Sequence, residues 1–180
     1  MSKEKKLNIC VMAGQNAGVI SIISALSLGC RINAAVSYSK ECEKILSLFD
    51  IPVFKSIKDD GFKNAILISD LLLSAHGREI VSAELLKIPK YGGVNIHPYL
   101  YAYKGADPVG RAILDSNFRA SVGSHIMTEK IDEGKVLFEE FIDVAGAKTR
   151  EDVYSALYPF YAGVVIKTLR AITSFSADIH

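Results

Sequence analysis

The fold is decided by Leu7-Asn-Ile-Cys-Val-Met-Ala13, an apolar run that is interrupted by Gly14-Gln-Asn-Ala-Gly18. The apolar run is typical of a buried β-strand, and the segment between the two glycines predicts a turn. Residues 19–28 carry apolar side chains at helical spacing, and Gly29 follows them as glycine often follows a helix end. A strand, a turn and a helix in this order indicate one unit of a parallel sheet covered by helices.

The same alternation continues along the chain. We expect strands at 33–38, 52–54, 70–75 and 93–97, and helices at 40–49, 65–68, 81–86 and 107–114, although 65–68 could also be a strand. Strands at 120–128 and 136–142 need not continue the parallel pattern. Thr149-Arg-Glu-Asp152 resembles a helix start, and the long helix that follows contains Pro159, which can kink it. The prediction is a doubly wound, mostly parallel α/β sheet with a long C-terminal helix, in one domain spanning residues 1–180.

Composition restricts the class of protein. The chain has 180 residues, of which 49% are hydrophobic and 23% charged, as is typical of a globular protein with a sizeable core. Its net charge of +1 predicts no nucleic-acid surface. Three cysteines without metal-ligand spacing indicate free thiols in a reducing compartment. Because no stretch approaches the roughly 18 apolar residues of a membrane span, we expect a cytoplasmic protein without a membrane partner.

Asn95 and His97 are the strongest candidates for chemistry. They lie two residues apart at the end of a predicted strand, so both side chains face the same side. Open parallel sheets bind ligands beyond the carboxyl ends of their strands. An amide donor beside an imidazole suits acyl transfer through an oxyanion. Asp132, in Ile131-Asp-Glu-Gly134, supplies a carboxylate that can orient or charge the imidazole, although in isolation a plain acidic turn is the favoured interpretation of this segment.

Other polar segments have two interpretations. Residues 14–18 could offer backbone amides to an anion, or form an ordinary turn, since they match neither G-x-G-x-x-G nor a P-loop. His76-Gly-Arg78 follows a strand and is interpreted as a polar loop, and His125 as a half-buried residue of a sheet. The histidines and acids lack zinc-ligand spacing, so we expect no metal.

Three segments together resemble the folate-dependent formyltransferase family. They are Gly92-Gly-Val-Asn-Ile-His-Pro98, Tyr103-Lys-Gly-Ala-Asp-Pro108 with Arg111-Ala-Ile113, and Ser121-Val-Gly-Ser-His-Ile-Met127 leading to Ile131-Asp-Glu-Gly134. The family includes glycinamide ribonucleotide transformylase, methionyl-tRNA formyltransferase and the sugar-nucleotide N-formyltransferases. The strong similarity covers residues 70–137, and the first half agrees with the Rossmann-like order of that family.

The resemblance implies that an amine attacks the formyl carbon of N10-formyltetrahydrofolate. Asn95 and His97 would stabilise the oxyanion, His97 would pass a proton to the folate nitrogen, and Asp132 would hold His97 in its charged form. The resemblance also implies a folate site formed largely by the backbone of Glu79, Ile80, Val81, Met127, Thr128, Glu129 and Ile131. The amine substrate would lie near Gly14, Gln15, Asn16, Tyr103, Lys104 and Gly105.

Two departures from the family bear on the acceptor. Many relatives read Ser-Leu-Leu-Pro-x-Tyr-Arg-Gly after His-Pro, whereas this chain has the shorter Tyr99-Leu-Tyr-Ala-Tyr-Lys-Gly105 without that proline. The sequence also ends soon after the predicted long helix, so we expect no tRNA substrate and no other nucleic acid. The first candidate is an amino-sugar nucleotide and the second is glycinamide ribonucleotide. Hydrolysis of formyltetrahydrofolate, or a non-catalytic module that binds folate or a nucleotide, are the alternatives.

One aromatic group bears on self-association. The group could form an exposed patch that supports a homodimer, or it could be part of the core. Its members are Tyr154, Leu157, Tyr158, Phe160 and Tyr161.

Overall fold

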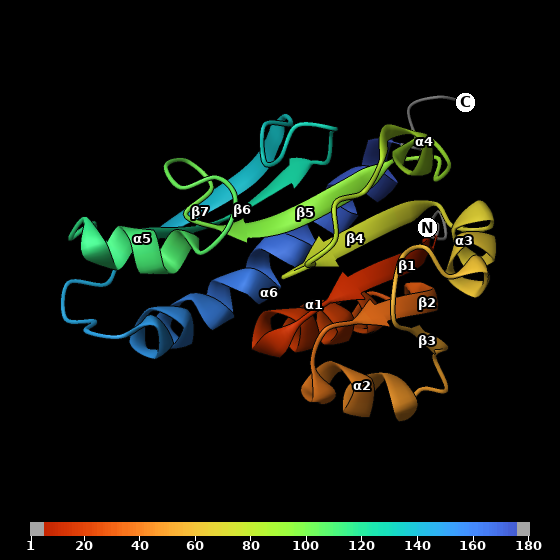
Figure 1. Cartoon of the computed structure of the whole chain (residues 1–180), viewed down its shortest axis with the longest axis horizontal. Helices are drawn as coiled ribbons and strands as arrows, with labels where there is room; N and C mark the ends of the chain where they lie inside the picture. Colours follow the sequence, from red (N-terminus) through yellow and green to blue (C-terminus); the bar gives the residue numbers. More distant parts are fainter. Residues whose placement is uncertain (1–5, 176–180) are drawn as a thin grey trace.

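The computed structural model describes residues 6–175, which form a single seven-stranded sheet with helices around it (Figure 1). The elements follow one another as β1 (Asn8–Ala13), α1 (Gln15–Ser27), β2 (Arg31–Ser37), α2 (Lys40–Ser47), β3 (Val53–Phe54), α3 (Asp60–Leu67), β4 (Leu71–Ala75), α4 (Ala83–Leu86), β5 (Gly93–Pro98), α5 (Pro108–Leu114), β6 (Arg119–Ile126), β7 (Val136–Asp143) and α6 (Arg150–Phe175).

The strand order is β3-β2-β1-β4-β5-β6-β7. The first five strands are parallel, and β6 and β7 pair antiparallel with their neighbours. The chain therefore builds the sheet in one direction from β1, then returns to start β4 on the other side of β1. This reversal opens a crevice at the carboxyl ends of β1 and β4, where doubly wound sheets bind ligands. The predicted doubly wound, mostly parallel fold and its long C-terminal helix are confirmed.

The central strands are apolar because helices cover both of their faces. In β1, Ile9 and Val11 face one core, which α1 and α6 complete, while Cys10 and Met12 face a smaller core on the α3 side. Every residue of β4 is buried. The alternation of side chains between two cores follows from the period of two along a strand.

The prediction of a turn over residues 14–18 is wrong, because α1 begins at Gln15. Gly18 lies inside this helix, and a Cβ there would contact the Cys42 Sγ and the backbone of Ala13 at 2.9 and 3.0 Å. The glycine thus permits close packing of the first helical turn on the end of β1. Gln15 has φ of +54°, so the chain turns sharply at this single residue and does not need a loop of several residues.

The aromatic residues of α6 belong mostly to the core. Leu157 and Tyr161 are buried, and Tyr154, Tyr158 and Phe160 pack partly buried against the same cluster. The helix continues through Pro159 as one element. Among the described helices, none combines the length and the apolar character needed to cross a bilayer.

Candidate active site

The carboxyl end of β5 places Asn95 and His97 on one side of the sheet, as predicted from their spacing. Asn95 pairs in register with Ser74 of β4 and with His125 of β6. The loop between β6 and β7 then returns over this strand end and brings Asp132 to both side chains. Asp132 lies in the left-handed region with φ of +53°, which Asp tolerates better than most residues.

A close backbone approach holds the Asp132 loop in place. A Cβ added at Gly134 would collide with the carbonyl oxygen of Ile126, so the loop can lie against the end of β6 only with glycine at this position. On the other side, the Gly105 amide donates a hydrogen bond to Asp132 Oδ2 at 2.7 Å, and Gly105 itself has φ of +81°. Both glycines therefore serve the placement of one carboxylate.

Four groups converge on the Asp132 carboxylate. His97 Nε2 lies 3.0 Å from Oδ2, beside the Gly105 amide. Asn95 Nδ2 donates to Oδ1 at 3.3 Å, and His125 Nε2 lies 3.2 Å from the same oxygen. Burial alone raises the pKa of Asp132, but the hydrogen bonds from His125 and His97 and the charge of His97 outweigh it and hold this pKa well below its ordinary value. The carboxylate is therefore ionised at neutral pH.

His125 belongs to this cluster, although its sequence position indicated only a half-buried residue of a strand. Its side chain is 2% exposed, and its Nδ1 lies 2.9 Å from the Ile126 carbonyl oxygen, to which it can donate. The antiparallel pairing of β6 with β5 places it opposite Asn95. Only this pairing register identifies His125, and the sequence does not encode the register in any local signal.

One nitrogen of His97 is left without a partner. His97 Nε2 contacts Asp132 and lies 3.3 Å from the Gly105 carbonyl oxygen. Nδ1 is buried and has no hydrogen-bond partner within residues 6–175. Since buried polar nitrogens are nearly always hydrogen-bonded, an orphaned imidazole nitrogen on a residue that lines a cavity indicates a contact with a ligand.

Two cavities meet at His97 and Asn95. The larger has a volume of about 440 Å³, and the sides formed by Ile80, Val81 and Met127 are apolar. All of the residues predicted for the folate line it, namely Glu79, Ile80, Val81, Met127, Thr128, Glu129 and Ile131. The Glu79 carboxylate is already engaged, because it accepts hydrogen bonds from Tyr38 Oη at 3.0 Å and Ser56 Oγ at 2.7 Å.

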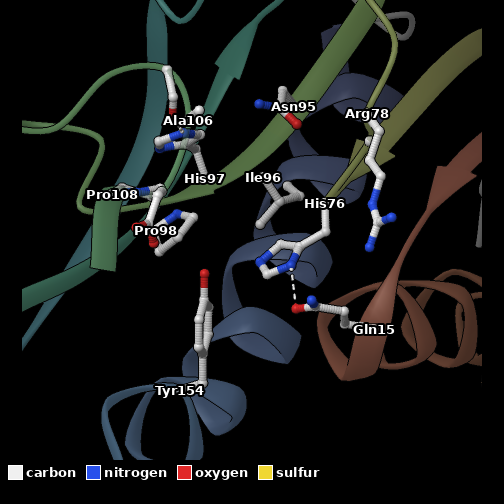
Figure 2. Close-up of a pocket in the computed structure, with 13 residues that line it drawn as sticks. Gln15, His76, Arg78, Asn95, Ile96, His97, Pro98, Ala106, Pro108 and Tyr154 are labelled. Carbon is white, nitrogen blue, oxygen red and sulfur yellow. Dashed lines mark hydrogen bonds between the residues drawn. The ribbon is translucent and has the colours of Figure 1, made fainter. Parts of the chain in front are cut away.

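The smaller cavity has a volume of about 220 Å³ and lies between β5, α6 and the start of α1 (Figure 2). Of the residues predicted for the acceptor, Gln15 and Gly105 line it. Four others line neither cavity: Gly14, Asn16, Tyr103 and Lys104. Figure 2 shows His97 and Ala106 on one side of the cavity and His76 with Gln15 on the other.

His76 is a further cavity residue that sequence reasoning missed, since it was interpreted as part of a polar loop. It follows β4, has φ of +55°, and lines the smaller cavity. Within residues 6–175, no group of three or more His, Cys, Asp or Glu residues has the geometry to hold a metal ion.

Comparison with known proteins identifies a family and several proteins that are similar in sequence or fold. The sequence model of the family described as Formyl transferase matches residues 64–168. The chain is 26% identical to the bifunctional polymyxin resistance protein ArnA of Wigglesworthia glossinidia brevipalpis, over 92% of this chain and 28% of that protein. It is 29% identical to the methionyl-tRNA formyltransferase of Pelotomaculum thermopropionicum, over 68% of this chain and 41% of that one.

The fold is similar to that of the phosphoribosylglycinamide formyltransferase from Anaplasma phagocytophilum. The TM-score is 0.79 at 19% identity, over 94% of this chain and 88% of that one. By contrast, the chain spans less than half the length of the curated relatives named above.

Proposed function

Because the chain belongs to the formyl transferase family, whose sequence model covers more than half of it, we propose that it transfers a formyl group from N10-formyltetrahydrofolate to a primary amine. The observation that carries this proposal is the unpartnered Nδ1 of His97, a residue that lines both cavities. One cavity would take the formyl donor and the other the amine, so that the two reacting atoms would meet at His97 and Asn95.

The larger cavity fits the folate donor. A pteridine is a flat heteroaromatic ring with hydrogen-bonding edges, and a cavity of about 440 Å³ lies in the usual size range for such ligands. Apolar side chains at Ile80, Val81 and Met127 can cover the ring faces. Backbone groups of residues 127–131 lie along the same wall and can pair with the ring edges. When bound, the donor supplies an activated one-carbon group at the oxidation level of formate.

Asn95 and His97 act on the charge that develops during transfer. As the amine nitrogen bonds to the formyl carbon, the formyl oxygen gains negative charge, and the second N–H of Asn95 Nδ2 can donate to it. His97 provides Nδ1–H at the same place and delivers a proton to the departing folate nitrogen as the carbon–nitrogen bond breaks. The proton that the amine loses passes by way of Asp132 to His97 and replaces the one that His97 gave up, so atoms and charge balance.

Asp132 keeps the imidazole ready for this proton transfer. Its carboxylate lies 3.0 Å from His97 Nε2, which fixes the orientation of the ring. The ionised state of Asp132 is secured by its low pKa, which His125 and the Gly105 amide help to maintain. The carboxylate is thus positioned before the substrates bind, and little reorganisation is needed during the reaction.

The acceptor that we propose is an amino-sugar nucleotide, with glycinamide ribonucleotide as the second candidate. Support comes from the segment Gly105-Ala-Asp-Pro108, which lines the smaller cavity and resembles the corresponding segment of the tRNA and sugar branches. The similarity to methionyl-tRNA formyltransferases makes methionyl-tRNA a necessary member of any acceptor panel.

The test is formyl transfer followed by folate absorbance, with a uridine diphosphate amino sugar, glycinamide ribonucleotide and methionyl-tRNA as acceptors. We expect turnover with one of them, and a loss of at least about a hundredfold in His97→Ala, since one such group typically contributes about 3–4 kcal/mol to the barrier. Thr168→Val is a matched control, because it removes a buried polar group from α6 outside both cavities. Unchanged turnover in His97→Ala would contradict the proposal. Folate release without any amine would indicate hydrolysis instead.

A further inference from the structure

Three side chains form a hydrogen-bonded chain at the wall of the smaller cavity that lies away from His97. His76 Nδ1 lies 3.0 Å from Gln15 Oε1, and His76 Nε2 lies 3.0 Å from Tyr161 Oη. The residues come from α1, from the end of β4 and from α6, so the contact joins three elements (Figure 2 shows Gln15 and His76). Gln15 and His76 line the cavity, whereas Tyr161 lies behind them.

The chain is anchored in the core. Tyr161 is fully buried, and its ring packs edge-on against His76 with centroids 5.9 Å apart. The ring of Tyr154 also packs edge-on against this imidazole, with centroids 5.3 Å apart. Burial lowers the pKa of His76 to about 4, with smaller contributions from the charges of His97 and Arg78, so the imidazole is neutral at pH 7.

Neutrality fixes the direction of every hydrogen bond. A neutral imidazole carries one N–H, and Gln15 Oε1 can only accept, so the proton is on His76 Nδ1. His76 Nε2 then has a lone pair, and the Tyr161 hydroxyl donates to it. With its oxygen held by His76, the exposed Gln15 carboxamide keeps its NH₂ group to donate at the cavity that it lines.

The backbone of both cavity residues is held in the left-handed region. Gln15 has φ of +54° and His76 has φ of +55°, a conformation that glycine adopts with less strain. Both residues nevertheless carry long polar side chains that meet each other. The contact of His76 with Tyr161 and the packing of α1 against α6 hold both residues in this strained conformation.

We propose that His76 and Tyr161 are positioning residues that hold Gln15 as a hydrogen-bond donor to an oxygen of the acceptor substrate. The inference rests on the proposed function, because it assigns the smaller cavity to the amine. It adds a requirement to the acceptor: an oxygen atom, of a hydroxyl or a phosphate group, on the side of the molecule that faces Gln15. Amines without such an oxygen leave this exposed donor to water and lose the hydrogen bond, so they bind more weakly.

The test compares Tyr161→Phe, Gln15→Ala and the double variant, using a uridine diphosphate amino sugar and glycinamide ribonucleotide as probes. We expect the acceptor KM to rise about tenfold in each single variant, the usual value of one neutral hydrogen bond. The kcat and the KM of the formyl donor stay unchanged. The double variant is no worse than Gln15→Ala alone, because both changes remove the same interaction. Additive effects, or a change in the donor KM, would overturn the proposal.

Gln15→Glu distinguishes the two sources of oxygen. A hydroxyl can turn and donate to the new carboxylate, so the KM of an acceptor that presents a hydroxyl rises only a few fold. A phosphate oxygen is repelled by the carboxylate, so an acceptor that presents a phosphate no longer binds. Thr168→Val again controls for loss of a buried hydroxyl from α6, and its KM values should equal those of the wild type.

A measurement without turnover separates this inference from the proposed function. The nitrogen chemical shifts of His76 in the whole protein at pH 7 report its tautomer, and we expect a protonated Nδ1 and an unprotonated Nε2. The opposite tautomer overturns the inference even in an active enzyme. If no amine is formylated, the proposed function fails, and calorimetric binding of the same two probes to the same variants then decides the role of Gln15.

Discussion

The half-buried imidazole of His76 makes the stability of the protein depend on pH in a defined window. The pKa of His76 is lowered from 6.5 to about 4 in the folded state, chiefly by burial. Between these values the unfolded chain takes up a proton that the folded chain does not, so the free energy of unfolding falls as the pH falls. Each pH unit in the window lowers the free energy of unfolding by at most about 1.4 kcal/mol, so the whole window of about 2.5 units lowers it by at most about 3.4 kcal/mol.

His76→Asn isolates this contribution. Asparagine tolerates the left-handed conformation at this position, and its amide can donate to Gln15 as Nδ1 does, but it does not titrate. Asp132 cannot imitate the effect, because its lowered pKa destabilises the protein only below its ordinary value of 3.8, outside the window. All other titrating groups are common to both proteins.

The measurement is urea denaturation of both proteins at several pH values between 4 and 6.5. We expect the wild type to lose about 2–3 kcal/mol more than His76→Asn on going from the upper to the lower end. If both proteins show the same slope of unfolding free energy against pH, the imidazole is not held neutral by the fold, and the reasoning about its hydrogen bonds fails.

Three further changes test the placement of Asp132. Gly134→Ala forces a Cβ onto the Ile126 carbonyl oxygen, so we expect a loss of more than 3 kcal/mol in unfolding free energy, or no folded protein, by chemical denaturation. Gly105→Ala meets no neighbouring atom and suffers only left-handed strain, so the loss should be about 1 kcal/mol, and an equal loss in both variants would contradict the contrast. His125→Asn removes one contact to Asp132, and formyl transfer should slow about tenfold with the acid limb of its pH–rate profile moved upward; an unmoved limb would show that His125 does not act on this carboxylate.

The fold was predictable because its signals are local. Apolar runs of five to seven residues separated by amphipathic segments predicted β1, β2, β4 and β5 within a residue or two. The turn predicted over residues 14–18 failed because a glycine inside a helix and a glycine in a turn look alike in sequence. Gly18 is in the helix so that α1 can approach Ala13, and only the packing of helix on strand distinguishes the two cases.

The site was predictable only in part, for a similar reason. Asn95 and His97 share a strand, so their period of two was sufficient to place them together. His125 reaches the same carboxylate through an antiparallel register, and His76 depends on Tyr161, which lies 85 residues further along the chain. Neither contact has a local sequence pattern, because each arises from tertiary packing of elements that are distant in sequence.

The central claim is that an ionised Asp132 holds His97 ready to transfer a proton, and Asp132→Asn tests it most directly. The variant keeps the size of the side chain, removes its charge and replaces one accepting oxygen by an NH₂ group, so single-turnover formyl transfer measures the contribution of the carboxylate. We predict a rate about a thousandfold to ten-thousandfold below the wild type, with unchanged affinity for the formyl donor. A rate within tenfold of the wild type, in a protein that is folded and binds the donor normally, would contradict this account.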